Sequence, residues 1–231
     1  MRKITLLFFL SFLCLGAFAQ EGLKIGLRFS PIISNGQIVD ANGNTVADDV
    51  TAKVGISYGL MANYGFTENY GIHTGVHIVT KGFNRAGGVI VDSAIQNIEE
   101  NVSITTVEIP LGLKLRTGEI SNGLHINGLF GLALEITASN RNRWTGVNPF
   151  TYETGASGTF QNRFVTPINL GFIFGAGGEY EINKVGIINF GLVYHRGITN
   201  MNRQNIYAEN TRGFTETYRV SYYSLELGYY F

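Results

Sequence analysis

Residues 217–231 read TYRVSYYSLELGYYF, and their side chains alternate between two kinds. Every second residue, ending at Phe231, builds a face that becomes apolar and finishes in aromatic rings. The residues between them, ending at Tyr230, build a second face that carries Glu226. Successive side chains of a β-strand point to opposite sides, so this period of two predicts a strand with one apolar and one wetter face.

Seven earlier stretches show the same alternation of apolar side chains with glycine or polar ones. Long polar connections and short turns join the eight stretches in regular succession. This rhythm is typical of transmembrane barrels, in which short periplasmic turns alternate with longer external loops and an even number of strands leaves both termini in the periplasm. The other predicted strands cover residues 22–31, 53–66, 70–83, 103–116, 124–137, 167–181 and 186–197, and the long connections cover 34–52, 84–102, 138–166 and 200–216.

The composition fits a membrane protein better than a soluble one. Charged residues make up 15% of the chain, well below the ~25% of soluble domains. The 30 glycines among 231 residues are also a high share for a globular chain. The formal net charge is zero, which gives no reason to expect nucleic acid as a partner.

The first residues differ from the rest of the chain. A basic start at Arg2 and Lys3 precedes an apolar run, and Ala17 and Ala19 supply the small residues of a cleavage site. This pattern predicts a signal peptide at residues 1–19 and one barrel domain at residues 20–231. The only cysteine, Cys14, leaves with that peptide, so we expect no disulfide and no thiolate metal site. No later stretch has the ~20 consecutive apolar residues of a membrane helix.

The predicted fold class is all-β: an eight-stranded antiparallel transmembrane β-barrel of the outer-membrane type, following an N-terminal signal peptide. The alternative is a soluble lipocalin-like barrel with its apolar faces inward, which would leave a sparsely charged surface of Gly, Asn and Ser. Glycines suit a narrow interior better, so the membrane barrel is preferred. Aromatic residues near strand ends are expected to form interfacial girdles. These are Tyr64, Phe66, Tyr70, Tyr180 and Phe231 at one end, and Phe29, Phe83 and Tyr194 at the other.

Three segments resemble the PorT-type family of small outer-membrane barrels: GLKIGLRFSP at 22–31, VEIPLGLKL at 107–115 and LELGYYF at 225–231. The EIPL piece is the most specific, because proline is disfavoured inside a paired strand. The resemblance implies the fold, the outer membrane and, as one candidate role, assistance in protein secretion. The terminal strand ending at Phe231 also resembles the strand that outer-membrane barrels present to the barrel-assembly machinery, which is therefore an expected partner.

The wetter faces of the strands are expected to gather charges inside the barrel. Buried charges have to be paired and hydrogen-bonded, so we expect a salt-bridge network that fills the lumen, with a narrow ion path or a proton-sensitive gate as the alternative. The histidines also face inward; His73 and His77 lie ~13 Å apart along their strand, and no metal or cofactor is predicted. The predicted network comprises Lys24, Arg28, Glu108, Lys114, Arg116, Glu135, Glu179 and Glu226.

The predicted loops separate charges, with acids in the first two and arginines in the last two. A basic rim of this kind suits lipopolysaccharide phosphates or an acidic partner, although loop charges are often only solvated. The predicted function is that of a non-enzymatic structural or interaction protein in contact with outer-membrane lipid. A secretion accessory and a small porin-like pore are the alternatives. The residues expected to make loop contacts are Arg141, Arg143, Trp144, Arg163, Arg203 and Arg212.

Overall fold

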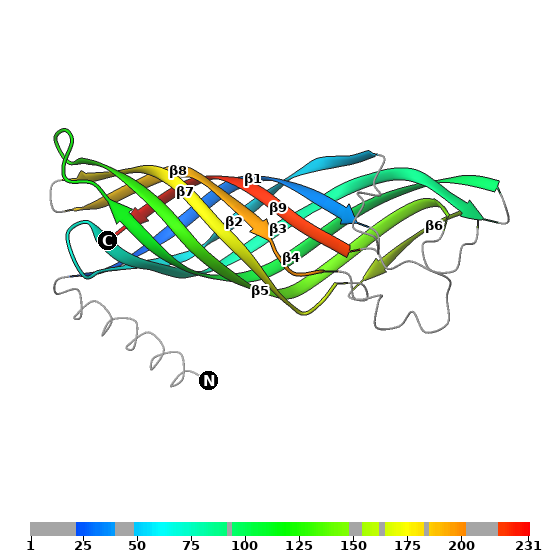
Figure 1. Ribbon diagram of the computed structural model, residues 1–231, viewed down its shortest axis with the longest axis horizontal. Coiled ribbons are helices and arrows are strands. Elements are labelled where there is room, and N and C mark those ends of the chain that lie inside the picture. The colour runs from blue at the N-terminus through cyan, green and yellow to red at the C-terminus, as the bar shows by residue number, and fades with distance from the viewer. Residues whose placement is uncertain are drawn as a thin grey trace, which may run out of the picture.

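The computed structural model shows a single antiparallel sheet wound into a barrel (Figure 1). It describes residues 22–39, 49–91, 94–147, 154–161, 165–182, 185–201 and 217–231, so the predicted signal peptide lies outside the described residues. No helix within those ranges is long and apolar enough to cross a membrane. The strands are β1 (Leu23–Val39), β2 (Asp49–Gly65), β3 (Tyr70–Val91), β4 (Ala94–Arg116), β5 (Leu124–Val147), β6 (Thr154–Gln161), β7 (Ile168–Ile182), β8 (Gly186–Gly197) and β9 (Thr217–Tyr230).

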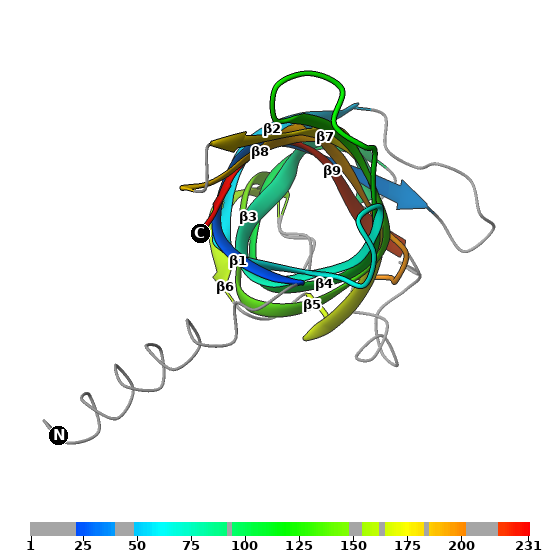
Figure 2. The same cartoon turned by 90° about the vertical axis from the view of Figure 1, so that its left-hand side faces the viewer.

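The strands close into a ring of eight positions, which Figure 2 shows end-on. Closure is made by β1 and β9, whose register places Leu27 opposite Tyr229. The ninth strand does not widen the ring, because β6 and β7 pair with successive parts of β5: Arg141 lies opposite Gln161 and Ile136 opposite Ile168. Together β6 and β7 occupy one position. The predicted eight-stranded antiparallel barrel is confirmed.

The apolar faces of the strands point outward and the polar faces point inward. On β4, Leu111 is 63% exposed while Glu108 is fully buried. This arrangement rules out the lipocalin-like alternative, in which the apolar faces would fill the interior. The outward band draws on every strand of the ring and includes Leu27, Tyr58, Val76, Leu111, Leu132, Phe172, Leu192 and Leu225.

The two ends of the barrel differ in length. Residues 66–69 and 117–123 make short links at one end, here named the short-turn end, where β1 begins and β9 ends. At the opposite, long-connection end, β3, β4, β5 and β6 continue as a sheet beyond the shorter strands (Figure 1). β4 has 23 residues whereas β8 has 12.

This extension corrects three of the predicted loops. Most of residues 34–52 belong to β1 and β2, and most of residues 84–102 belong to β3 and β4. The predicted loop at 138–166 contains the end of β5 and all of β6. On β4 the reason is clear: Val102 and Ile104 stay buried, but the outward Asn101 and Ser103 are polar. A strand with few apolar residues resembles a loop in sequence.

A β-bulge on β5 also interrupts the alternation by which the full length of this strand could have been predicted. Thr137 pairs with Thr106 and Ser139 with Thr105, which leaves Ala138 without a partner across the ladder. Before this residue the even-numbered side chains of β5 point outward, and after it the odd-numbered ones do. One inserted residue exchanges the two faces of every later position, so the alternation loses its phase.

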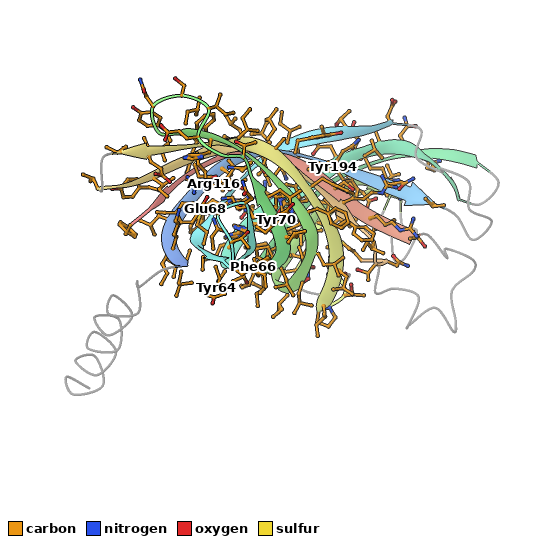
Figure 3. All side chains as sticks on the ribbon, turned by 60° about the vertical axis from the view of Figure 1, so that its left-hand side comes forward. Tyr64, Phe66, Glu68, Tyr70, Arg116 and Tyr194 are labelled. Carbon is orange, nitrogen blue, oxygen red and sulfur yellow. The ribbon has the colours of Figure 1, made fainter. Side chains whose placement is uncertain are left out.

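The aromatic girdles are mostly placed as predicted. Figure 3 shows Tyr64, Phe66 and Tyr70 near the short-turn end and Tyr194 farther towards the other end. The first three are each at least half exposed. Phe83 was predicted wrongly: it shares the inward parity of β3 and is 1% exposed, because it packs inside the barrel.

Candidate functional site

The inward faces bring most of the predicted lumen residues together. Lys24 and Arg116 are the exceptions, since both are only half-buried. Lys24 lies at the short-turn mouth. There it borders a cavity of about 540 Å³ that Arg116 and Glu179 also line. The predicted residues that are buried in the lumen are Arg28, Glu108, Lys114, Glu135, Glu179 and Glu226.

Arg28 belongs to the first of two charged layers in the lumen, which also contains Glu108, Glu135 and Glu226. Its Nε lies 3.5 Å from Glu226 Oε2 and donates to Ser30 Oγ at 3.0 Å. Its Nη1 lies 3.1 Å from His77 Nδ1. A guanidinium only donates hydrogen bonds, so His77 accepts at Nδ1 and carries its ring proton on Nε2. The buried cation is thereby held by a carboxylate, a hydroxyl and an imidazole from β9, β1 and β3.

Glu108 is a fully buried carboxylate held by aromatic groups. The Tyr222 hydroxyl donates to its Oε2 at 2.6 Å, and His195 Nδ1 lies 3.4 Å from the same oxygen. The His195 ring stacks on Tyr222 with centroids 4.1 Å apart. Side chains therefore connect β4 across the lumen with β8 and β9, strands with which it shares no ladder.

Lys81 and Glu135 form an almost fully enclosed ion pair in the lumen. Lys81 Nζ lies 2.5 Å from Glu135 Oε1, with side-chain exposures of 0% and 4%. The ammonium also lies 5.2 Å from the centre of the Tyr222 ring. An aromatic face attracts a cation, so Tyr222 contributes to both the Glu108 and the Lys81 contacts.

A second charged layer lies nearer the short-turn end. Lys114 Nζ lies 2.5 Å from Glu179 Oε1, and Arg116 Nε lies 3.1 Å from the other oxygen of that carboxylate. Arg116 also pairs with Glu181, whose side chain is 43% exposed at the mouth. The layer therefore runs from a buried pair to a partly solvated one.

Several members of these layers were absent from the predicted network. Lys81, His77 and Tyr222 connect the predicted charges. Asn63 lies 2.5 Å from the Tyr230 hydroxyl, which in turn lies 3.5 Å from Lys114 Nζ in the second charged layer. All of them fall on the inward-facing positions of their strands, so the alternation of the sequence could have identified them. Parity places Tyr222 and Tyr230 on the inward face but assigns no partner to their hydroxyls, which here contact a buried carboxylate and a buried amide.

An apolar cluster lies across the lumen towards the long-connection end. Val165 and Met201, from the segments that follow β6 and β8, pack inside the barrel at 6% and 3% exposure. Backbone bonds fix them there: Thr166 N–H donates to the Met201 carbonyl and Met201 N–H to that of Tyr218. The cluster consists of Ile38, Phe83, Val102, Ile104, Val165, Met201 and Val220, and we call it the apolar plug.

Three of the six residues predicted to make loop contacts are instead on β5. Arg141 and Arg143 point outward and are exposed. Trp144 points inward and is 5% exposed, so it does not lie on the outward face with the two arginines. The bulge at Ala138 is the reason, because without it the arginines and the tryptophan would exchange faces. Arg163, Arg203 and Arg212 lie outside the described residues.

The described histidines do not gather into a metal site. Within the described part of the chain, no group of three or more His, Cys, Asp or Glu side chains is arranged to hold a metal ion. The rings of His73 and His77 are closer than their spacing along the strand predicted, with centroids 6.5 Å apart, because the side chains lean towards each other.

Comparison with known proteins places the fold. A family profile described as "outer membrane protein beta-barrel domain" matches residues 18–203. No curated protein sequence matches the chain. Among solved structures, the outer membrane protease OmpT of Escherichia coli has a TM-score of 0.52 at 9% identity, covering 92% of this chain and 97% of its own.

Two further structures are similar over nearly the whole chain. OprG of Pseudomonas aeruginosa has a TM-score of 0.43 at 14% identity and covers 91% of this chain and 96% of its own. Ail of Yersinia pestis has a TM-score of 0.38 at 12% identity and covers 92% of this chain and 100% of its own. Identities this low transfer no activity, including proteolysis. The profile match spans most of the chain, and the chain belongs to the outer membrane β-barrel family, which implies an outer-membrane location.

Proposed function

We propose that this protein is a sealed, non-enzymatic barrel whose working surface is the sheet that extends beyond the membrane at the long-connection end. In this arrangement the short turns and both chain ends face the periplasm. The observation that carries the proposal is the filled lumen, in which paired charges occupy two layers and the apolar plug lies above them.

The size of the barrel supports a sealed interior. Eight strands leave space for side chains rather than for an aqueous channel. The buried charges already have partners on other strands, as Arg28 has in Glu226 and Lys81 in Glu135. An ion crossing the lumen would have to separate these pairs and then displace the plug, both at a large energetic cost.

The extended sheet supplies a surface for recognition. On β4 the outward side chains change from apolar at Val107 to polar at Thr105, Ser103 and Asn101. The polar part therefore stands in water or among lipid headgroups, outside the hydrocarbon. The charged surface at the short-turn mouth is already paired through Arg116, Glu179 and Glu181.

The test is conductance of the purified barrel in a planar bilayer, after heat-modifiable gel migration has shown that it is folded. We expect no steady current, because the plug and the pairs close the lumen. A steady conductance that changes in Glu135→Gln or Arg116→Gln would refute the sealed barrel and favour the porin-like pore.

The PorT-type resemblance adds a candidate set of partners, the components of protein export. Within the segment that carries the resemblance, Pro110 lies inside the β4–β5 ladder opposite Ala133, and its carbonyl accepts a bond from Thr74 Oγ1 at 2.8 Å. Co-purification of export components with the barrel would support this role, and their absence after gentle crosslinking would argue against it.

A further inference from the structure

Three cations converge on the outward face of the barrel just beyond the apolar band. Lys53 Nζ crosses from β2 to β4, where it lies 2.8 Å from Asn101 Oδ1 and 2.5 Å from Ser103 Oγ. The β4–β5 register places Asn101 opposite Arg143 and Ser103 opposite Arg141. Directly opposed residues on one face have Cβ atoms ~5 Å apart, so both arginines flank the lysine contacts. We call Lys53, Arg141 and Arg143 the basic patch.

Neutral groups rather than acids hold the ammonium group of Lys53. Asn101 and Ser103 accept from Lys53, and the Asn101 amide donates to Asn84 Oδ1 at 2.6 Å. The outward acids of the same sheet, Asp49 and Glu99, lie farther from the apolar band, since Glu99 is opposite Thr145 and Asp49 opposite Ala86. Like charges brought close together repel, so an anion placed among these three cations would relieve the repulsion.

The patch lies at the level of lipid headgroups. The outward apolar band ends at Val107 on β4 and Ile136 on β5, which are paired. Ser103 is four residues beyond Val107, ~13 Å along the strand and ~10 Å in height for a tilt of ~40°. The headgroup zone adds ~5–7 Å to each side of the hydrocarbon, and long basic side chains bend towards it.

The sheet beside the patch is hollowed. A cavity of about 490 Å³ is lined by Asn84, Asn101 and Arg143 together with Asp49 and Glu99. It offers amide and guanidinium donors on its membrane side and carboxylates on its far side. A phosphate with attached hydroxyl groups fits this division, because arginine forks bind phosphate oxygens in pairs while carboxylates accept from hydroxyls.

We propose that the basic patch binds the phosphate of a phosphorylated membrane lipid standing beside β2–β5. The inference deepens the proposed function, since it names a ligand for the extended sheet. Arg143 contributes a bidentate contact, Arg141 a second fork and Lys53 a point charge that Asn101 and Ser103 hold in place.

The experiment measures lipid retention by the purified barrel in phosphatidylcholine nanodiscs doped with bis-phosphorylated lipid A, read by native mass spectrometry. Arg143→Gln removes a charge-assisted contact, so we expect retention to fall about tenfold. The matched control is Arg196→Gln, another exposed outward arginine, on β8, two ring positions from β5. It should change retention less than about twofold, because the patch is not on β8.

Other outcomes would overturn the proposal. If Arg143→Gln and Arg196→Gln lost lipid A equally, retention would depend only on the overall charge of the barrel. If the wild-type barrel retained dephosphorylated lipid A as well as the phosphorylated form, phosphate would be excluded as the recognised group. Displacement of the lipid by inorganic phosphate at low concentration would assign the patch to a soluble anion. Heat-modifiable migration of each variant shows that it is folded. A conducting barrel that still retains the lipid would refute the sealed lumen and leave this proposal intact.

Discussion

At the scale of single residues, the lumen depends on charges that cannot be removed one at a time. Lys81 and Glu135 lie 2.5 Å apart and are almost fully enclosed. Glu135→Ala leaves the lysine charge buried without its carboxylate, which costs ~3–5 kcal/mol in comparable pairs. We expect that loss in the free energy of unfolding, measured by urea denaturation of the barrel in lipid vesicles.

The matched control is Glu181→Ala, which removes the same side chain from an ion pair with Arg116 at 43% exposure. Partly solvated ion pairs contribute ~0–1 kcal/mol, so Glu181→Ala should hardly change the free energy of unfolding. The double variant Lys81→Met with Glu135→Leu should regain most of the lost stability, because it leaves no unpaired charge. A double variant as unstable as Glu135→Ala would show that the lumen needs these charges for another reason.

At the scale of elements, the bulge on β5 decides which side chains face water and which fill the barrel. Ala138 has no partner in the ladder, and Trp144 beyond it is 5% exposed. Deleting Ala138 restores a continuous alternation and turns the later residues over. Trp144 would then point outward, and Arg141 and Arg143 inward.

Trp144 is the single tryptophan of the chain and reports this change directly. We expect the folded wild-type barrel to emit at short wavelength and to resist acrylamide quenching. Deletion of Ala138 should shift the emission to longer wavelength and expose it to acrylamide. Ala138→Ser keeps the residue count and should leave the spectrum unchanged. An unaltered spectrum in the deletion variant would mean that the bulge moves elsewhere on β5.

At the scale of the whole molecule, the two ends carry different surfaces, and this difference predicts the orientation. The extended sheet and the outward cations Arg141, Arg143 and Arg196 lie towards the long-connection end. Short turns of membrane barrels face the periplasm. Ser157 on β6 is therefore expected to face the outside of the cell, and Ser121, in a short turn, is expected to face the periplasm.

The prediction can be tested by labelling, because the only cysteine of the sequence is in the predicted signal peptide. Ser157→Cys should react with a membrane-impermeant maleimide on intact cells. Ser121→Cys makes the same substitution at another exposed serine, and it should react only after the outer membrane is opened. Labelling of Ser121→Cys alone on intact cells would reverse the proposed orientation.

The network shows how far local reasoning reaches into the site. Parity along each strand was enough to place Arg28, Glu135 and Glu226 in the lumen, because alternation is a property of neighbouring residues. Parity could not predict which of these residues contact one another. Arg28 contacts Ser224 across 196 positions of sequence, and Lys81 contacts Glu135 across 54. Such pairs depend on the register of the closed ring.

The sequence by itself determined the eight-stranded ring, the outward apolar band and the inward polar faces. Each follows from side chains that alternate over a few residues and from the sparse charge of the chain. The tertiary structure alone decided the length of the strands beyond the band, the inward position of Trp144 and the convergence of Lys53 with Arg141 and Arg143. Physically, one bulge reverses every later face, and a strand surrounded by water no longer needs the apolar residues that reveal it.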